Sequence, residues 1–393
     1  MSYKKVKISD IGKIVSGATP KTKDVDNYGG SIAWITPADL SGYTSKYISH
    51  GSRNITQKGY DSCSTHLMPR GTVLFSSRAP IGYVAIAENP ICTNQGFKSI
   101  VPNDDIDSEF LYYQLQYLRK KIQEKGSGTT FKEISGKVLG ETDIVVPSLE
   151  EQSRIVAHIE ELFSELDKAV DTLKTTKEQL EVYRQAVLKD AFSDFEKKDS
   201  IRNLTMVVTS GSRDWAKYYS NSGALFVRIG NLTHSGIDID FRDIQHITPP
   251  DNAEGVRTRL QPNDVLVSIT ADLGSIGFVS EKVEEAYINQ HIALVRFQNP
   301  VQGRFMAWYL RSEYGQKDLL KNKRGGGKLG LGLDDIRDTP VPIVSDLVAQ
   351  KTVDEIEERL SVCDSIEKTV DATLAQADAM RQSILKQSFE EKI

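Results

Sequence analysis

The sequence has few cysteines and histidines and no long apolar run. Cys63, Cys92 and Cys363 lie far apart without a CxxC pair, and the six histidines are scattered, so neither a disulfide framework nor a metal site is predicted. No apolar run approaches the roughly 20 residues that a membrane-spanning helix needs, and residues 1–10 lack the apolar core of a signal peptide. We therefore expect a cytoplasmic protein that is neither exported nor inserted in a membrane.

Motifs of enzymes that act on nucleic acids are also missing. The sequence has no Walker pair, no Pro-Asp…Glu-x-Lys nuclease pattern and no Asn-Pro-Pro-Tyr type of methyltransferase motif. Two glycine-rich stretches, 126–128 and 325–332, are not P-loops, because no Gly-Lys pair in them is followed by Ser or Thr. They are either plain surface turns or loops that approach a phosphate with help from the nearby cations Lys125, Lys132, Arg324 and Lys328. We expect no catalytic site and no cofactor bound by this chain.

The excess of negative charge is confined to two segments. The formal net charge is −5, yet residues 1–149 carry 18 basic and 14 acidic residues, and residues 200–345 carry 17 and 16. Residues 150–199 carry 8 basic and 13 acidic residues, and residues 346–393 carry 6 and 11. The two larger segments are therefore mildly basic, which permits a surface that faces phosphates.

What the sequence does contain is an internal repeat. Residues 184–192 (RQAVLKDAF) and 381–389 (RQSILKQSF) are identical at five of nine positions. Upstream, residues 34–40 (WITPADL) match 226–232 (FVRIGNL). The other matched pairs are Asn94-Gln95 with Asn289-Gln290 and Ile81-Gly82 with Ile276-Gly277. Because the order of the matches is the same in both halves, the sequence predicts a tandem duplication.

Each copy has the pattern of a mixed domain. The predicted strands are residues 72–76, 83–87, 264–269 and 278–280, which are short apolar and β-branched runs between turn residues. Leu111, Leu115, Leu118 and Ile122 recur at helical spacing, and residues 305–320 form a less regular counterpart. Strands at the front and a helix at the end of each copy favour an α+β fold.

A long heptad-patterned helix follows each globular segment. Apolar residues alternate at steps of four and three in both helices, although Arg359 interrupts the second. The predicted seam consists of Ile155, Ile159, Leu162, Leu166, Leu173, Leu180, Tyr183 and Val187 in the first helix and of Ile356, Cys363, Val370, Ala377 and Ile384 in the second. Charged residues fill the other positions, so each helix, roughly 45 residues or about 65 Å long, must pair along one stripe.

These boundaries define four segments. The globular domains are residues 1–147 and 197–345, and the helices lie within residues 148–196 and 346–393. Only residues 196–200 separate the first helix from the second domain, so the second helix runs antiparallel to the first if the two pair. We prefer this intramolecular pairing to one in which each seam pairs with another chain.

Several motifs resemble those of the specificity subunits of type I restriction-modification systems. They are Ser16-Gly17-Ala18-Thr19-Pro20, residues 34–40, Ser77-Arg78-Ala79-Pro80-Ile81-Gly82, residues 228–232 (RIGNL) and the two Arg-Gln-x-(Val/Ile)-Leu-Lys helix ends. The resemblance covers essentially the whole chain. The second copy departs from the first, because it has Thr270-Ala271-Asp272-Leu273 in place of the Arg78 segment and lacks Thr-Pro after Gly211.

The resemblance implies a non-catalytic DNA-specificity subunit of a bacterial or archaeal cytoplasm. Two target-recognition domains would each read one half of a bipartite, asymmetric site in double-stranded DNA. An antiparallel two-helix coiled coil, arising from a pseudo-twofold duplication, would set their spacing and dock two methyltransferase subunits, and restriction subunits would join the full complex. S-adenosylmethionine, ATP and magnesium would belong to those partners. The alternative is a coiled-coil assembly scaffold without DNA specificity.

Basic side chains are the predicted DNA contacts, because cations bind phosphates and arginine reads guanine edges. The candidates are Lys21, Lys23, Arg53, Arg78 and Lys132 in the first domain and Arg213, Arg228, Arg257, Arg324 and Lys328 in the second.

Overall fold

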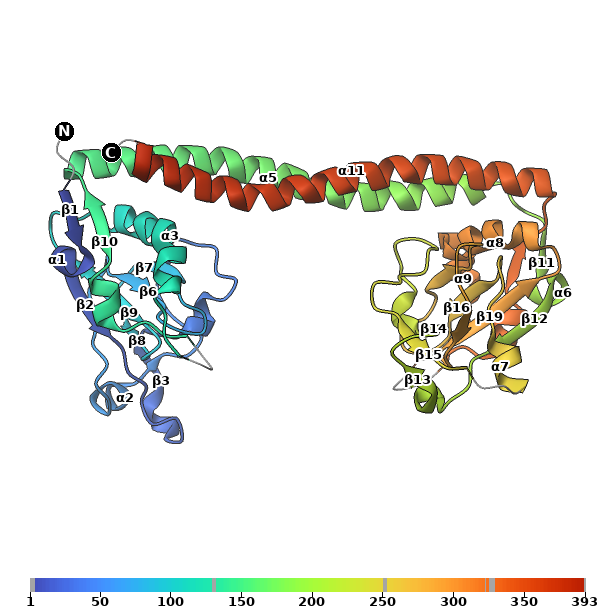
Figure 1. Ribbon diagram of the computed structural model, residues 1–393, viewed down its shortest axis with the longest axis horizontal. Coiled ribbons are helices and arrows are strands. Elements are labelled where there is room, and N and C mark those ends of the chain that lie inside the picture. The colour runs from blue at the N-terminus through green and yellow to red at the C-terminus, as the bar shows by residue number, and fades with distance from the viewer. Residues whose placement is uncertain (1–3, 129–131, 250–252, 322, 325–328, 392–393) are drawn as a thin grey trace. The chain divides into compact units, whose positions relative to one another are not determined.

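A computed structural model describes residues 4–128, 132–249, 253–321, 323–324 and 329–391. The chain divides into two compact units, Met1–Leu173 with Ala372–Ile393, and Lys174–Asp371. Each unit holds one globular domain and parts of two long helices, α5 (Leu149–Phe192) and α11 (Asp346–Lys386) (Figure 1). The unit boundaries fall inside these helices, so each globular domain packs with its own share of both.

The first globular domain is built from short strands and one long helix. Its strands are β1 (Lys4–Lys7), β2 (Gly12–Ser16), β3 (Tyr28–Ile32), β4 (Trp34–Ile35), β5 (Tyr47–Ile48), β6 (Val73–Phe75), β7 (Val84–Ala87), β8 (Cys92–Thr93), β9 (Lys98–Pro102) and β10 (Asp143–Val146). Its helices are α1 (Ile8–Ile11), η1 (Val25–Asn27), η2 (Pro37–Leu40), α2 (Gln57–Asp61), α3 (Ser108–Glu124) and α4 (Gly136–Gly140). The central sheet has the order β2-β9-β6-β7-β5, and two smaller sheets pair β1 with β10 and β4 with β8.

Both faces of this central sheet are buried, which explains the unbroken apolar run of β6. Val73 and Phe75 pack with Leu111 and Leu115 of α3, whereas Leu74 belongs to a separate core on the opposite face. Successive strand residues point to opposite faces, so a strand covered on both sides needs apolar residues at every position. The predicted helix through Leu111 is α3, and its predicted core positions are buried.

The second globular domain repeats this order of elements. Its strands are β11 (Lys198–Ser200), β12 (Thr205–Ser210), β13 (Tyr219–Ser220), β14 (Ala224–Val227), β15 (Gln245–Ile247), β16 (Val265–Ser268), β17 (Ile276–Phe278), β18 (Ala286–Ile288), β19 (Ile292–Phe297) and β20 (Pro340–Pro342). Its helices are α6 (Ile201–Leu204), η3 (Trp215–Tyr218), η4 (Ile229–Asn231), α7 (Ala253–Thr258), η5 (Pro300–Gln302), α8 (Gly303–Arg311), α9 (Glu313–Leu319) and α10 (Leu333–Arg337), and η6 (Gln387–Glu391) follows α11.

The strand pairings confirm the predicted duplication. The sheet β12-β19-β16-β17 corresponds to β2-β9-β6-β7, the β11–β20 pair to β1–β10, and the parallel β14–β18 pair to the parallel β4–β8 pair. The irregular counterpart of α3 is divided into α8 and α9, because the Ser312 hydroxyl caps a new helix by accepting from Gly315 N at 3.3 Å. The predicted α+β class is confirmed in both domains.

Helices α5 and α11 are antiparallel within each unit. In the second unit Lys177 Nζ lies 2.8 Å from Asp371 Oδ1, and further along α5 Arg184 contacts Asp364, which is earlier in α11. In the first unit the end of α11 packs against the start of α5. The predicted intramolecular pairing is therefore confirmed.

Most residues of the predicted seam are at least partly buried. Ile155, Ile159, Leu180, Val187, Ile356, Cys363, Val370 and Ala377 are buried, and Leu162, Leu166, Leu173 and Ile384 are half-buried. The prediction for Tyr183 is wrong, because its side chain is 44% exposed and Arg184 takes the seam position. The heptad from Leu180 to Val187 can be completed through Tyr183, by steps of three and four, or through Arg184, by steps of four and three. Because the sequence was searched for apolar positions, tyrosine was chosen over arginine.

Arg184 is accommodated in the seam by two carboxylates of α11. Its Nη2 donates to Asp364 Oδ1 at 2.6 Å and to Glu367 Oε2 at 3.0 Å. Burial would lower the pKa of Arg184, but these two bonds outweigh it and raise the pKa. The aliphatic stem supplies the apolar contact that the seam requires. Arg381 and Asp167 stand at the matching positions of the repeat and form the same ion pair in the first unit.

Candidate nucleic-acid interface

The loop between β6 and β7 has a fixed backbone. Ala79 has a φ of 53° and Gly82 a φ of 101°, and the peptide bond before Pro80 is cis. The Ser76 hydroxyl donates to Pro80 O at 2.7 Å and accepts from Tyr83 N at 2.8 Å. These bonds join Ser76 to residues on the far side of Arg78, so Arg78 lies within a hydrogen-bonded turn.

The loop between β16 and β17 has the same construction. Ala271 has a φ of 62° and Gly274 a φ of 84°. The Ser268 hydroxyl donates to Asp272 O and accepts from Ser275 N at 2.8 Å. The two loops therefore share the pattern Ser-x-x-Ala-x-x-Gly, with 192 residues between matching positions.

This match corrects one pairing made from the sequence. The partner of Gly82 is Gly274, which shares its left-handed backbone, and not Gly277, which lies inside β17. Ile276-Gly277 occurs by chance at a similar offset. The assignment of Thr270-Ala271-Asp272-Leu273 to the place of the Arg78 segment is confirmed.

Two further segments pair beside each loop, and the three paired segments form what we call a ledge. In the first domain Arg78 pairs with Glu133, which in turn pairs with Ser127. Backbone bonds of 3.0 Å and 2.9 Å link Ser127 and Glu133 in both directions, and Ile134 N donates to Ser77 O at 3.0 Å. We call residues 76–82, 127 and 133 the first ledge.

The second ledge consists of residues 268–274, 324 and 330. Thr270 pairs with Gly330, and Gly330 pairs with Arg324 through backbone bonds of 3.0 Å and 2.9 Å. Leu331 N donates to Ile269 O at 2.9 Å, as Ile134 N does in the first domain. Of the predicted glycine-rich stretches, residues 325–327 and the candidate Lys328 lie outside the described residues.

The first ledge concentrates positive charge around Arg78. Its Nη1 lies 3.7 Å from Glu133 Oε2, with the two side chains 35% and 42% exposed. Burial lowers the pKa of Lys98 on the neighbouring strand β9, and Arg78 lowers it further, while Glu133 acts in the opposite direction. The predicted candidate Lys132 is exposed beside this ledge and, with Ala79 and Pro80, lines a hollow of about 490 Å³.

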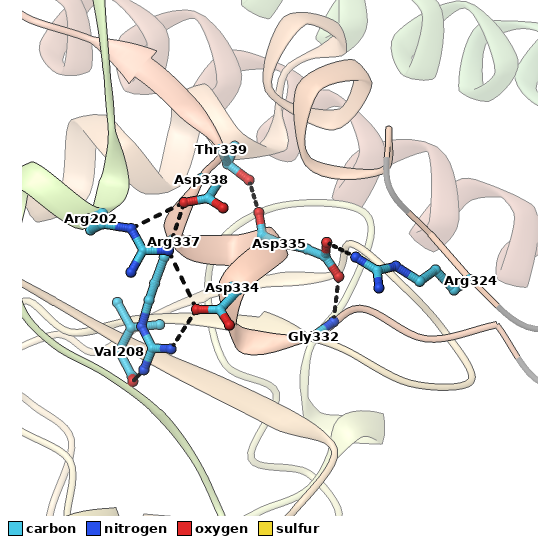
Figure 2. Close-up of polar contacts among 9 residues, drawn as sticks. All are labelled: Arg202, Val208, Arg324, Gly332, Asp334, Asp335, Arg337, Asp338 and Thr339. Atoms are coloured by element: carbon cyan, nitrogen blue, oxygen red, sulfur yellow. Dashed lines mark hydrogen bonds and ion pairs between the residues drawn. The ribbon is translucent and has the colours of Figure 1, made fainter.

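The second ledge carries its arginine on the opposite segment. Arg324 Nη2 donates to Asp335 Oδ1 at 3.0 Å, and Asp335 Oδ2 accepts from Gly332 N at 2.8 Å (Figure 2). The Asp335 side chain is 7% exposed and that of Arg324 is 78% exposed. Asp335 thus fixes one side of the guanidinium and leaves the rest in solvent.

The base of α10 is tied to the rest of the second domain by a separate ionic group. Arg202 of α6 lies 2.7 Å from Asp338, and Arg337 donates to Asp334 at 3.0 Å and to Val208 O of β12 at 2.8 Å (Figure 2). These contacts fix the helix that carries Asp335. Their arginines are occupied by structural partners and are poor candidates for DNA contacts.

Two turns beside each ledge have the same hydrogen bonds in both domains. Thr36 N donates to Asp39 Oδ2 at 2.7 Å, and Arg228 N donates to the equivalent Asn231 Oδ1 at 2.8 Å. Gly96 N donates to Asn94 Oδ1 at 2.8 Å, just as His291 N donates to Asn289 Oδ1 at 3.1 Å. In the first domain these turns and Arg78 line one hollow of about 460 Å³.

Two glycines hold these turns close to a neighbouring strand. A Cβ on Gly17 would lie 2.0 Å from Thr93 O, and one on Gly211 would lie 2.3 Å from Asn289 O. Only glycine permits this approach. The Gly17 motif identified in the sequence therefore has a packing role that the second copy retains without its Thr-Pro.

Uncharged side chains occupy the second ledge where the first has Arg78. Thr270 Oγ1 is hydrogen-bonded to His291 Nδ1, and Gln290 Nε2 lies 3.0 Å from His291 Nε2. The first domain has Gln95 and Gly96 at the positions of Gln290 and His291. The two domains therefore present different chemistry on the same backbone.

The remaining predicted contacts are spread over both domains. Lys21, Lys23 and Arg53 are exposed in the first, and the Arg53 guanidinium stacks 3.5 Å from the Tyr28 ring centroid. In the second, Arg213 is exposed, Arg228 donates to Asp243 O at 3.2 Å, and Arg257 donates to Thr209, Ser210 and Ser212. The guanidinium of Arg257 thus joins α7 to β12. Arg213, in contrast, remains a candidate for DNA contact because its side chain is exposed.

The sequence also missed a polar group around His234. Its Nε2 lies 2.8 Å from Asp272 Oδ1 and 3.0 Å from Ser275 Oγ. The bond from His234 lowers the pKa of Asp272. A hydrolytic triad places the acid and the serine on opposite ring nitrogens, whereas here both face Nε2. The group anchors residues 233–235 to the second ledge.

A lysine that the sequence did not suggest anchors the corresponding loop of the first domain. Lys46 Nζ lies 2.9 Å from Glu109 of α3 and also contacts Glu160 of α5. Burial would lower the pKa of Lys46, but these two carboxylates outweigh it and raise the pKa. The loop leading from η2 to β5 is therefore joined to α3 and α5.

Within the described residues, no group of three or more His, Cys, Asp or Glu side chains is arranged to hold a metal ion. Over the same ranges, no helix is long and apolar enough to cross a membrane.

Comparison with known proteins identifies the class to which this architecture belongs. Residues 2–182 match the family model for the type I restriction modification DNA specificity domain. The chain has the fold of a chain solved in a structural study of complex assembly and conformational transition of the type I R-M system, with a TM-score of 0.77 at 17% identity over 100% of this chain and 98% of that one. It also matches the HsdS subunit from Thermoanaerobacter tengcongensis, with a TM-score of 0.58, 18% identity and coverage of 100% and 97%.

Two curated relatives narrow the identification. The MjaIX specificity subunit of Methanocaldococcus jannaschii is 45% identical over 192 residues, which are 48% of this chain and 44% of that relative. The EcoBI specificity subunit of Escherichia coli is 24% identical over 422 aligned positions, covering 99% of this chain and 85% of that protein. The resemblance found in the sequence is confirmed for the specificity domain: residues 2–182 match the family model of that domain, and the two curated relatives are specificity subunits of type I restriction enzymes.

Proposed function

We propose that this chain supplies the DNA specificity of a type I restriction-modification complex by reading a bipartite, asymmetric site. Residues 1–147 would read one half-site and residues 197–345 the other. The observation that carries this proposal is the pair of ledges, because one backbone framework occurs twice with different side chains on it. Two readers of unlike half-sites require this combination of a shared scaffold and divergent contacts.

The helix pair would set the spacing of the half-sites and dock two methyltransferase subunits. In support, Tyr183 and Met380 stand at matching positions of the repeat, and their side chains are 44% and 53% exposed. Val362, on the same helix as Met380, is 57% exposed. Exposed apolar side chains at equivalent positions of the two helices could each bind one of two equivalent partner subunits.

Catalysis would belong to those partners. S-adenosylmethionine would bind to the methyltransferase subunits, and ATP and magnesium would serve the restriction subunits of the full complex. This chain would contribute binding and orientation alone. Phosphate contacts from its basic side chains would make DNA binding depend on salt.

The test is adenine methylation by the reconstituted complex. The chain is co-purified with the methyltransferase subunits of its own system and supplied with labelled S-adenosylmethionine and duplex DNA. We expect methyl transfer by the complex and none by the chain alone, with binding that weakens as salt rises. Methyl transfer by the isolated chain, or a complex whose methylation ignores DNA sequence, would contradict the proposal.

Two substitutions test the proposed docking surface for the methyltransferase subunits. Y183E and M380E each place a charge on one predicted contact, so each should weaken binding of one methyltransferase subunit and leave the other bound. Exposed Gln185 provides a control in Q185E. Native mass spectrometry counts the bound subunits, and two subunits retained by Y183E/M380E would reject this surface.

A further inference from the structure

The two ledges differ in which of their outer segments carries the arginine. The first ledge presents Arg78, Glu133 and Ser127 in order across its three paired segments, and the second presents Thr270, Gly330 and Arg324. Each ledge therefore has one arginine, carried on opposite sides of an equivalent framework. We propose that the place of this arginine determines which base pair of each half-site must contain guanine.

This inference rests on the proposed DNA-reading function and adds the residues that set its specificity. Arginine is suited to guanine because its two parallel N–H groups match the N7 and O6 acceptors in the major groove. Threonine and serine, which stand at the other outer positions, bond to several bases and select none strongly. The arginine is thus the discriminating group on each ledge.

Each guanidinium is held by a carboxylate in a way that leaves donors free. Glu133 lies 3.7 Å from Arg78 Nη1, while Asp335 accepts from Arg324 Nη2 at 3.0 Å. The two acids come from different elements, the central segment of the first ledge and helix α10 in the second. A guanidinium oriented before binding loses less conformational entropy when it pairs with a base.

The loops that carry Arg78 and its counterpart Thr270 share one backbone, because Ala79 and Ala271 both adopt left-handed conformations and the Ser76 and Ser268 hydroxyls bond across both loops. Arg324 is held by backbone bonds of 3.0 Å and 2.9 Å to Gly330. Neighbouring strands lie about 4.8 Å apart, so moving the arginine across two pairings displaces it by roughly 10 Å. That displacement corresponds to about two to three base-pair steps of 3.4 Å.

The competing role for these arginines is contact with phosphate. A phosphate contact supports binding to every sequence alike, whereas a base contact changes the preference at one position. R78K separates the two roles, because lysine keeps the charge and loses the planar fork. We expect R78K to retain most non-specific affinity and to lose the guanine preference.

The experiment selects duplexes from a library randomised across both half-sites, using the complex with its methyltransferase subunits. R78T should reduce a guanine preference of about tenfold or more to less than about twofold at one position of the first half-site. R324S should do the same in the second half-site. T270R/R324S should move the required guanine within the second half-site and leave the first unchanged.

Two controls accompany these variants. Arg70 is exposed on the first domain and outside the ledge, so R70T should leave the selected motif unchanged. Thermal unfolding of each variant complex checks that the fold is intact, and R78K is the variant on which the conclusion rests if R78T unfolds.

The outcomes separate this inference from the function on which it rests. If the unmodified complex selects no motif, the proposed function fails. If it selects a motif that R78T, R78K and R324S all preserve, or if these variants weaken every sequence equally, the ledge arginines are not base readers and the inference is overturned.

Discussion

Arg184 Nη2 lies 2.6 Å from Asp364 Oδ1, joining α5 to α11. The repeat places the same two residue types at Arg381 and Asp167, which are also paired. The identity of the two helix ends therefore reflects one ion pair used twice. The Arg184 side chain is 9% exposed, whereas that of Arg381 is 33% exposed, so the two pairs should differ in their contribution to stability.

R184A should lower the free energy of unfolding of its unit by about 2 kcal/mol, mainly through lost packing of the stem. Asp364 is 69% exposed, so water can solvate the carboxylate that loses its partner. R184M restores the apolar volume and should recover at least half of the loss. Urea unfolding measures these effects, with Q185A as an exposed control on the same turn. Equal midpoints for R184A and Q185A would show that this arginine does not support the seam.

K46M should destabilise the first domain by about 1 kcal/mol at neutral pH, because Glu109 and Glu160 would then face each other without a cation. Burial alone would raise the pKa of Glu109, but bonds from Tyr47 and Lys46 outweigh it and lower the pKa. Glu109 therefore contributes to the free energy of unfolding above the ordinary glutamate pKa of about 4.3, and this contribution is lost as the pH falls through the lowered pKa of Glu109.

The stability difference between the unmodified chain and K46M should accordingly shrink as the pH is lowered below about 4.3. Denaturant titrations at a series of pH values measure it. Lys120 is exposed on α3, so K120M is the matched control and should show no such trend. A difference that stays constant down to the acid limit would argue against the carboxylate clamp.

G17A and G211A should each destabilise their own domain by about 3 kcal/mol or more, because the added methyl group would overlap a backbone oxygen. Gly230 offers a control, since a Cβ there would meet nothing within 4 Å. Thermal unfolding of the three variants checks the prediction. If either G17A or G211A matches G230A, the shared close approach is not required.

Cysteine reactivity should distinguish the three thiols. Burial raises the pKa of Cys92 to about 11 and also raises the pKa of Cys363, while Cys63 is half-buried. Because the thiolate is the reactive form, iodoacetamide at pH 8 should label Cys63 first and the other two after unfolding. Mass spectrometry of the labelled peptides reports the order, and rapid native labelling of Cys92 would contradict its placement in the core.

The sequence predicted the large-scale organisation because apolar periodicity determines it. The duplication, the α+β class, the core positions of α3 and the antiparallel helices followed from spacing and chain connectivity. Arg184 could not be found in this way, because its seam position depends on a long polar side chain whose partners are 180 or more residues distant. Lys46 was missed because its partners, Glu109 and Glu160, are also distant from it in the sequence.

The candidate interface was found only in part. Lys132 and Arg324 were recognised as basic residues near glycine-rich loops, and Arg78 as part of the motif at residues 77–82, but their place on or beside the paired ledges depends on long-range backbone bonds. One signal was available in the sequence, the pattern Ser-x-x-Ala-x-x-Gly at residues 76–82 and 268–274. It was obscured by the nearby Ile-Gly match at 276–277, which has a similar offset and lies in a strand.

The most direct test of the account is a map of methylated adenines in the genome of a methylation-deficient bacterium that expresses the chain with its methyltransferase subunits. The account predicts one bipartite motif with two different half-sites, separated by a gap of fixed length, and no methylation when this chain is omitted. Methylation that persists without the chain, or a motif that is continuous or palindromic, would contradict it.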